Sequence, residues 1–317
     1  LCETIEEAFR DNGNKPVVLL AHSMGNNMAH YFTNWVLNNG DKVQQIKGAA
    51  NSNGEAWLDK YVHSLFGIGG PYLGASEALR SCIAGDDFGM GPALLPAQDA
   101  RTLCQAMGSA AWLLPAGRLA EHHPVAYDRV ALKTETSVKL GNGVASGHYE
   151  SRTVDEALRS HAAEHVAEQK KQWYDGDPCI PGGSSMMPPP LKRVFHVYGI
   201  NLDTQVGCVF KQQEGTHELD TSVNFGRIDG VRYQNGIILE TDDTSQRVLH
   251  ANTFVQDSNS PPEATEIKRV SGDGTVPYTS LQHTLSWNSP RCLSQVVELD
   301  RAEHREILGD GRFHQVL

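Results

Sequence analysis

Hydrophobic positions in the first 40 residues change from a continuous run to helical spacing. Residues 16–20 read P-V-V-L-L, and a short apolar run bounded by turn residues is typical of a strand buried on both faces of a parallel sheet. Five large apolar residues then recur at helical spacing: Met28, Tyr31, Phe32, Trp35 and Val36. Asn39-Gly40 favours a helix end. The pattern predicts a strand, a sharp turn and a helix over residues 16–39.

Further along the chain, strand-like runs alternate with a less regular region. Three more short apolar runs predict strands, at residues 62–68, 193–199 and 294–299. Residues 231–240 predict a hairpin, because Asn235-Gly236 is the favoured two-residue turn. Over residues 85–190, Gly and Pro interrupt short helical stretches. We predict that this region forms a cap or lid inserted over the sheet.

Composition and charge exclude several classes of protein. The 317 residues are 39% hydrophobic and 21% charged, which argues against disorder, a coiled coil or a collagen-like chain. The net charge of −11 disfavours binding to nucleic acid and a lasting electrostatic hold on an anionic membrane. No run approaches the roughly 18 apolar residues of a membrane span. The six cysteines contain no C-x-x-C pair, so we expect no structural zinc site.

The sharpest chemical signal is A-H-S-M-G at residues 21–25. A small residue and a glycine placed two positions either side of a serine, between a strand and a helix, form a nucleophile elbow. The tight turn would present the Ser23 hydroxyl at the N-terminus of the helix. The backbone N–H of Met24 is then a candidate oxyanion-hole donor. A chance turn is the plainer interpretation, which the flanking strand and helix disfavour.

A serine nucleophile needs a base and an orienting acid, which in this type of fold follow in the order Ser, Asp or Glu, His. Asp273 lies in S-G-D-G-T-V-P, where glycines leave its carboxylate unobstructed, although an Asx turn uses the same residues. Asp203 is the alternative acid, at the place where a plain sheet of this type ends its strand. His304 follows a predicted strand by five residues and is the favoured base; His283 and His314 are the other histidines after Asp273.

A competing metal motif occurs at residues 161–165. The sequence H-A-A-E-H matches the inverted zinc-protease pattern, which on a helix would place His161 and His165 one turn apart. Its surroundings of Ala, Glu, Gln and Lys are typical of a solvated helix face, and no third ligand is evident. We therefore favour a surface helix and expect no metal site.

Read together, these motifs resemble the lecithin:cholesterol acyltransferase and phospholipid:diacylglycerol acyltransferase family of α/β-hydrolases. Five stretches carry the likeness, in family order: A-H-S-M-G-N-N-M at 21–28, G-I-G-G-P-Y-L-G-A-S-E-A-L at 67–79, G-D-D-F-G-M at 85–90, V-Y-G-I-N at 197–201, and S-G-D-G-T-V-P at 271–277 followed by E-H at 303–304. The second stretch is closer to the diacylglycerol branch and the third to the sterol branch. The acyl acceptor therefore stays open.

The resemblance implies a fold and a division of the chain. We expect an α/β-hydrolase-type, mostly parallel sheet with helices on both faces. The core would comprise residues 1–84 with the elbow and residues 191–317 completing the triad. Residues 85–190 would form the cap or lid, and an inserted hairpin would occupy about residues 205–265.

The resemblance also implies the site. Ser23, Asp273 and His304 would form the catalytic triad, with the Met24 N–H in the oxyanion hole. Lid and acyl-pocket residues are expected at Gly85, Asp86, Asp87 and Trp112. The implied activity moves a fatty acyl group from a phospholipid to diacylglycerol or a sterol through an acyl-serine, at a lipid surface and without a cofactor. Hydrolysis by a phospholipase A or lipase, and a non-catalytic lipid-binding relative, are the alternatives.

Two further expectations follow from the resemblance. Family members place several strands and the second oxyanion donor before the elbow, whereas 22 residues precede Ser23 here. We therefore expect the first strands to be missing, the edge beside the elbow to be open and this span alone to be poorly active. The implied compartment is the secretory pathway or the lumenal face of the endoplasmic reticulum membrane.

Overall fold

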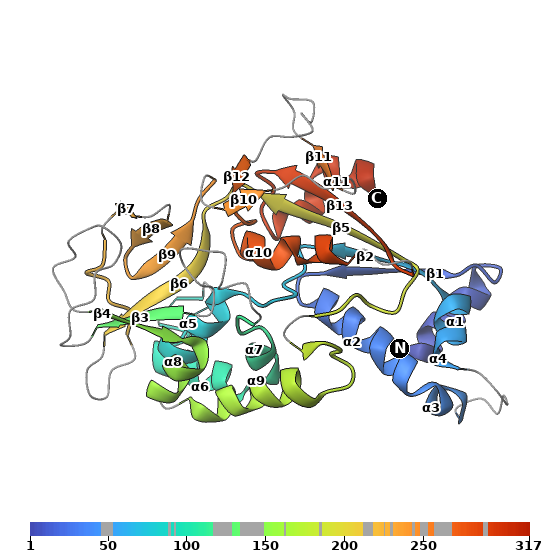
Figure 1. Cartoon of the computed structure of the whole chain (residues 1–317), viewed down its shortest axis with the longest axis horizontal. Helices are drawn as coiled ribbons and strands as arrows, with labels where there is room; N and C mark the ends of the chain where they lie inside the picture. Colours follow the sequence, from blue (N-terminus) through green and yellow to red (C-terminus); the bar gives the residue numbers. More distant parts are fainter. Residues whose placement is uncertain are drawn as a thin grey trace.

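The structure is a computed structural model. It describes residues 1–45, 53–87, 90–91, 93–116, 129–133, 149–161, 163–183, 186–211, 218–224, 226–228, 231–242, 245–247, 253–256, 268–287 and 291–317. Within them the chain is α/β, with a five-stranded parallel sheet, a six-stranded mixed sheet and a two-stranded ribbon (Figure 1). Among these residues, no helix is both long enough and apolar enough to pass through a bilayer.

The strands are β1 (Val17–His22), β2 (Val62–Ile68), β3 (Arg129–Lys133), β4 (Tyr149–Thr153), β5 (Arg193–Ile200), β6 (Thr204–Lys211), β7 (Gly226–Ile228), β8 (Val231–Gln234), β9 (Ile237–Glu240), β10 (Ser245–Arg247), β11 (Thr253–Gln256), β12 (Lys268–Val270) and β13 (Leu293–Asp300). The helices are α1 (Cys2–Asp11), α2 (Gly25–Asn38), α3 (Gly40–Gln45), α4 (Gly54–Tyr61), α5 (Ser76–Ala84), α6 (Ala97–Ala106), α7 (Gly108–Trp112), α8 (Val154–Ser160), α9 (Glu164–Gly176), α10 (Tyr278–Leu281), α11 (Gly311–Val316) and the 3₁₀ helices η3 (Gln282–Ser286) and η4 (Glu306–Gly309).

The parallel sheet has the strand order β1–β2–β5–β13–β11. Because the strands run in one direction, the loops after β1, β2, β5 and β13 leave the same edge, where open α/β sheets bind ligands. The strands β1, β2, β5 and β13 confirm the four apolar runs that the sequence predicts, to within two residues at each end. β1 is the outer strand among those described, and its Val18 and Leu20 are about half exposed.

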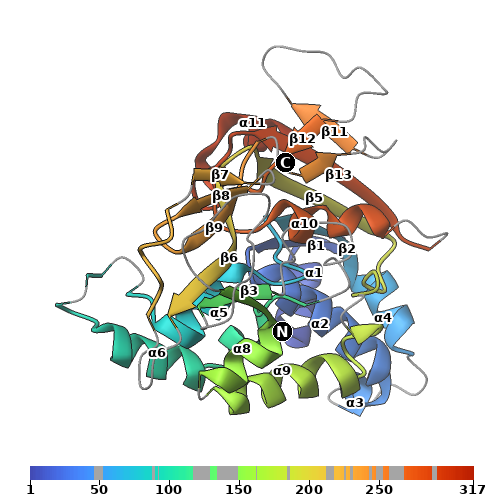
Figure 2. The same cartoon turned by 60° about the vertical axis from the view of Figure 1, so that its left-hand side comes forward.

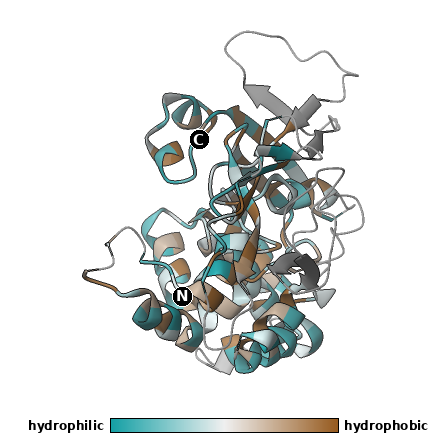
Figure 3. Ribbon diagram, turned by 90° about the vertical axis from the view of Figure 1, so that its left-hand side faces the viewer, coloured by the Kyte–Doolittle hydropathy of each residue, from teal (hydrophilic) through white to brown (hydrophobic). Residues whose placement is uncertain are grey.

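Helices cover both faces of this sheet, as expected. Alternate side chains of β2 point to opposite faces. Leu65 packs into a cluster with residues of α2 and α4, whereas Phe66 packs with Phe313 of α11. In Figure 3 hydrophobic residues, drawn in brown, gather in the strands at the centre. The two clusters hold the parallel sheet between its helices and fix the edge from which the loops emerge.

The six-stranded sheet has the order β4–β3–β6–β9–β8–β7. This sheet contains strands from two regions that were predicted to be separate. β3 and β4 belong to the predicted cap, whereas β6 to β9 belong to the predicted hairpin insertion. The turn between β8 and β9 is the predicted Asn235-Gly236, with φ of +51° and +80°. Figures 1 and 2 place α6, α8 and α9 along the side of the molecule away from β11 and β13.

Candidate active site

A strained turn carries Ser23 between β1 and α2. Its φ is +54°, in the left-handed region that non-glycine residues seldom adopt, and such strain persists only where surrounding contacts enforce it. The Ser23 N–H donates to the carbonyl of Ile68 at 2.9 Å, which ties the turn to the end of β2. Met24 directly precedes the first residue of α2, so its N–H lies at the N-terminus of the helix. The local geometry is that of a nucleophile elbow.

Asn26 stabilises this turn through hydrogen bonds. The sequence did not indicate this role. Its amide donates to the carbonyls of Ser23 and Ile68, at 3.0 and 2.9 Å, and its Oδ1 accepts from the Tyr72 hydroxyl at 3.2 Å. A Cβ on Gly67 would lie 2.3 Å from this Oδ1, so β2 needs glycine there. Tyr72 and Gly67 belong to the stretch 67–79 that carries part of the family resemblance. Only the three-dimensional contacts show that this stretch supports the elbow.

Three residues distant in the chain meet at the edge of the sheet. His304 Nε2 lies 2.9 Å from Ser23 Oγ, and His304 Nδ1 lies 2.7 Å from Asp273 Oδ2. The other carboxylate oxygen, Oδ1, accepts from the N–H groups of Val276 at 2.8 Å and Thr275 at 3.2 Å. Asp273 and His304 are buried, at 1% and 3% exposure. The three predicted residues therefore form one continuous hydrogen-bonded chain.

Two opposing effects set the pKa of His304. Burial lowers it, but the hydrogen bond and charge of Asp273, together with the charge of Glu303, more than offset burial, so the pKa is raised above 6.5. A hydroxyl, an imidazole and a carboxylate linked in this order can transfer a proton from the serine and stabilise the imidazolium that forms. The arrangement is suited to nucleophilic attack on an ester carbonyl.

Two neighbouring residues contact the loop of His304 or leave space for its ring, and the sequence did not indicate either role. His22 Nε2 donates to the carbonyl oxygen of His304 at 2.8 Å, which links the elbow directly to the loop that carries the base. Gly69 has a φ of +53°, and a Cβ there would lie 3.0 Å from His304 Nδ1 and 3.3 Å from Asp273 Oδ2. His22 lies within the elbow motif, so its position was visible but its distant partner was not.

The alternative acid and bases lie elsewhere. Asp203 is exposed and pairs with Arg232. The ring of His283 donates to the carbonyl of Met186 at 2.9 Å. His314, on α11, contacts the carbonyl of Leu308. None of the three is among the hydrogen-bonded partners that the described structure gives Ser23.

The zinc-protease motif does not assemble a metal site. Buried His161 follows α8 and contacts the carbonyl of Ala157 at 2.8 Å, whereas exposed His165 lies on α9 and contacts the carbonyl of Gln105 at 3.3 Å. Within the described ranges, no group of three or more His, Cys, Asp or Glu side chains could hold a metal ion.

A cleft of about 490 Å³ opens beside Ser23. Its charged lining residues are Glu77, Arg80, Asp86 and Arg305. Its other lining residues are mostly small or apolar: Pro71, Ala75, Ala78, Ser81, Cys104, Met107, Ser109, Ala110, Leu113, Thr275 and Val276. Burial raises the pKa of Glu77 above its ordinary value. The cleft thus combines walls that are mostly small or apolar with four ionisable side chains.

The four expected lid and pocket residues are in different places. Asp86 lines the cleft and pairs with Arg80. Gly85 turns the chain with a φ of +83°, while the Asp87 carbonyl accepts from the Met90 N–H at 2.9 Å. Trp112 is buried among Tyr31 and Trp173 and is not among the described residues that line the cleft.

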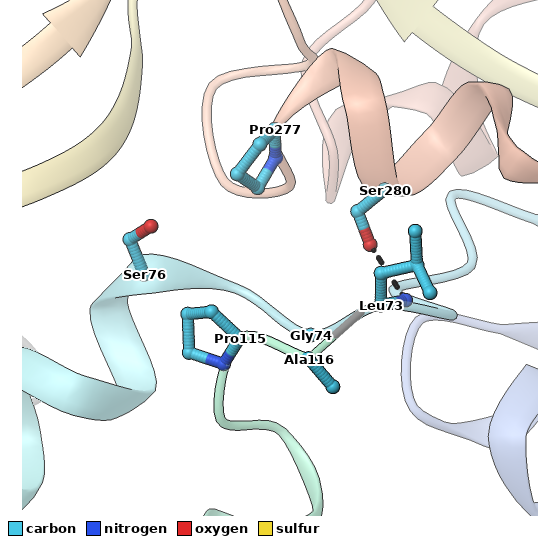
Figure 4. Close-up of a pocket in the computed structure, with 7 residues that line it drawn as sticks. All are labelled: Leu73, Gly74, Ser76, Pro115, Ala116, Pro277 and Ser280. Atoms are coloured by element: carbon cyan, nitrogen blue, oxygen red, sulfur yellow. Dashed lines mark hydrogen bonds between the residues drawn. The ribbon is translucent and has the colours of Figure 1, made fainter. Parts of the chain in front are cut away.

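A second, much smaller cavity lies between the residues that follow the Asp273 loop and the segment before α5. Figure 4 shows Ser280 beside Leu73, and Ser280 Oγ accepts from the Leu73 N–H at 3.0 Å. Its volume of about 10 Å³ is comparable to a single water molecule. Only the larger cleft, of the two, could therefore receive a substrate chain.

Comparisons with known proteins give one consistent family. The family described as lecithin:cholesterol acyltransferase matches residues 1–311. The phospholipid–sterol O-acyltransferase of Arabidopsis thaliana is 26% identical, covering 91% of this chain and 48% of that protein. The lysosomal phospholipase A and acyltransferase of Mus musculus is 32% identical, covering 43% and 27%. The phospholipid:diacylglycerol acyltransferase of Schizosaccharomyces pombe is 21% identical, covering 74% and 41%. The chain spans about half the length of these relatives, or less.

Proposed function

The chain belongs to the lecithin:cholesterol acyltransferase family, and from that premise we propose that it transfers a fatty acyl group from a phospholipid to an alcohol through an acyl-serine. The observation that carries the proposal is the 2.9 Å contact of Ser23 Oγ with His304 Nε2, continued to Asp273 at 2.7 Å. This order of groups is what an activated serine requires.

The proposed reaction proceeds in two halves. His304 takes the proton of Ser23 as its Oγ attacks the ester carbonyl, and it returns that proton to the lysophospholipid oxygen when the ester C–O bond breaks. The acceptor alcohol then gives its proton to His304 and attacks the acyl carbon, and Ser23 leaves with the proton restored. Asp273 keeps Nδ1–H oriented and supports the imidazolium. These steps need no metal or organic cofactor.

Two further elements would assist this reaction. We assign the N–H of Met24 to the oxyanion hole, because it lies at the N-terminus of α2 where N–H groups point outward. The cleft beside Ser23 would take the acyl chain, with Asp86 at its wall. We do not assign that role to Trp112, because Tyr31 and Trp173 enclose its ring.

A lipid surface is the proposed source of the donor. Four large apolar side chains between positions 90 and 107 are 41% to 79% exposed: Met90, Leu94, Leu103 and Met107. One of the four, Met107, also lines the cleft. The lysosomal relatives favour the secretory pathway as the compartment.

Water is the second candidate acceptor. The mouse relative is named for both phospholipase A and acyltransferase activity, and both outcomes share one acyl-enzyme. Diacylglycerol and sterol stay open as alcohol acceptors, since the relatives are named for each. Incubation with acyl-labelled phospholipid and either alcohol separates the three outcomes, because the label ends in triacylglycerol, sterol ester or free fatty acid.

Labelling by a fluorophosphonate tests the nucleophile in the full-length protein. We expect stoichiometric labelling that Ser23→Ala abolishes, while Ser160→Ala, a change at an exposed serine on α8, leaves it intact. Labelling that persists in Ser23→Ala would overturn the proposal. Absence of labelling in the unaltered protein would favour a lipid-binding relative without turnover.

A further inference from the structure

The backbone of the loop that carries Asp273 is bound by side chains of the six-stranded sheet. Glu240, at the end of β9, accepts through Oε1 from the N–H of Gly272 at 2.8 Å and that of Tyr278 at 2.7 Å. Thr204, at the start of β6, accepts through Oγ1 from the N–H of Gly274 at 2.9 Å. Two side chains thus hold three N–H groups on both sides of Asp273.

These two side chains come from facing positions of the sheet. Thr204 and Glu240 are cross-strand partners in the antiparallel pair β6–β9, so both side chains lie on the same face. Both residues are fully buried. Burying a carboxylate and a hydroxyl is costly unless they are hydrogen-bonded, so the loop and the strand pair stabilise each other's position.

The fit between loop and sheet is close. A Cβ on Gly272 would lie 3.0 Å from Thr204 Oγ1 and 2.1 Å from the Val276 carbonyl oxygen, so residue 272 can approach only as glycine. The carbonyls of Ser271 and Gly272 also accept from the two N–H groups that directly follow β5, at 3.0 and 3.1 Å. The loop is therefore fixed by the parallel sheet on one side and by Thr204 and Glu240 on the other.

We propose that Glu240 and Thr204 are positioning residues for the triad, which hold the Asp273 carboxylate against His304 Nδ1. This rests on the proposed function only in treating the triad as catalytic. Gly272 and Gly274 directly flank Asp273, so losing their hydrogen bonds would let the carboxylate move. A shift of about 1 Å in a catalytic group can cost on the order of 10²-fold in rate. The six-stranded sheet would then contribute two residues that set the geometry of the active site.

The test compares isosteric and conservative variants in the full-length protein. Thr204→Val removes the acceptor and keeps the shape, and Thr204→Ser keeps the acceptor. Glu240→Ala removes the acceptor, and Glu240→Gln keeps an oxygen at that place. Gln234→Ala, at an exposed residue of β8, is the control for the sheet itself. We expect the fluorophosphonate labelling rate to fall 10- to 100-fold in Thr204→Val and Glu240→Ala. It should stay within threefold in Thr204→Ser, Glu240→Gln and the control Gln234→Ala.

Two readouts separate positioning from general loss of structure. Release of Asp273 should move the midpoint of the labelling-versus-pH curve downward in Thr204→Val, because Asp273 raises the pKa of His304. It should also remove the far-downfield proton resonance of His304 Nδ1–H, which does not depend on turnover. Thermal unfolding identifies any variant that fails to fold, in which case the other acceptor-removing variant decides.

The outcomes for the two proposals are distinct. If Thr204→Val and Glu240→Ala fold and keep both the wild-type midpoint and the resonance, the positioning role is wrong. If the unaltered protein shows the resonance but Ser23 is not labelled, the proposed activity fails, and the resonance in the variants still decides the positioning role.

Discussion

Two groups of buried residues, one around His304 and one around His30 and His196, differ in what surrounds the imidazole. At the sheet edge that carries Ser23, His304 is hydrogen-bonded to the carboxylate of Asp273, and its pKa is raised. On α2 and β5, His30 and His196 pack against Trp287, with ring centroids 5.6 and 5.4 Å away, and burial lowers their pKa values to about 4 and about 3. Both groups are almost fully enclosed, so burial alone cannot explain the difference.

The hydrogen-bond partner of His30 is a neutral carbonyl group. His30 Nε2 donates to the carbonyl of Met187 at 2.7 Å, and Nε2 of His196 has no hydrogen-bond partner among the described residues. The hydrogen bond of His30 raises its pKa less than burial lowers it, and the charge of His283 lowers it further. The comparison teaches that a buried imidazole becomes a usable base only where a carboxylate shares its burial.

Removing that carboxylate should have the largest effect. Asp273→Asn keeps the shape of the side chain but can neither support the imidazolium nor enforce the tautomer of His304. We expect the labelling rate and the turnover to fall by on the order of 10³- to 10⁴-fold at neutral pH. A loss below tenfold, measured on protein with unchanged thermal unfolding, would contradict the role of Asp273.

Crowding the imidazole should have an intermediate effect. Gly69→Ala adds a Cβ 3.0 Å from His304 Nδ1 at a residue with a φ of +53°, so we expect a loss of 10- to 100-fold in labelling rate and about 1–2 kcal/mol in the free energy of unfolding. Gly13→Ala is the matched control, because Gly13 has a φ of +67° and no atom within 4 Å of the added Cβ. Equal activity losses in both variants would refute the contact with His304.

The pH dependence of stability should differ in sign between the two groups. Below pH 6.5 the unfolded chain protonates its histidines before folded His30 and His196 do, so the free energy of unfolding falls as the pH falls toward 4. His304 acts oppositely, because its raised pKa adds stability that is lost as the pH rises through that pKa. Denaturant titrations at several pH values measure both slopes.

A substitution at His30 sharpens this last prediction. His30→Gln keeps a donor for the Met187 carbonyl and removes the titration, so we expect the slope between pH 4 and 6.5 to decrease by up to about 1.4 kcal/mol per pH unit. An unchanged slope would mean that His30 is not held neutral in the folded protein.

The features predicted correctly from sequence are those whose signals are local. The apolar strand and the helix on either side of Ser23 predict the elbow. The residue pair Asn235-Gly236 predicts its own turn. His304 could be selected because few histidines follow Asp273 and one of them follows a strand. Such signals span only a few residues, so they can be interpreted without knowledge of the fold.

The features that were missed depend on partners far away in the chain. Nothing near Glu240 in the sequence indicates that it binds the N–H groups of Gly272 and Tyr278, 32 and 38 residues later. The parallel pairing of β3 with β6 could not be predicted either, because the two strands lie in regions that the sequence pattern divides. Trp112 was expected near the acyl pocket, but aromatic packing with Tyr31 and Trp173 is a property of the assembled helices.

His304 follows Ser23 by 281 positions in the chain, which has a consequence for biosynthesis. At a translation rate of 5–20 residues per second, roughly 14–56 s pass between the synthesis of the serine and that of the histidine. During this interval the nascent serine lacks its base and is no more reactive than any other serine. In the proposed mechanism Ser23 therefore stays without its base until β13, the last strand of the parallel sheet, and the loop that follows it have been synthesised.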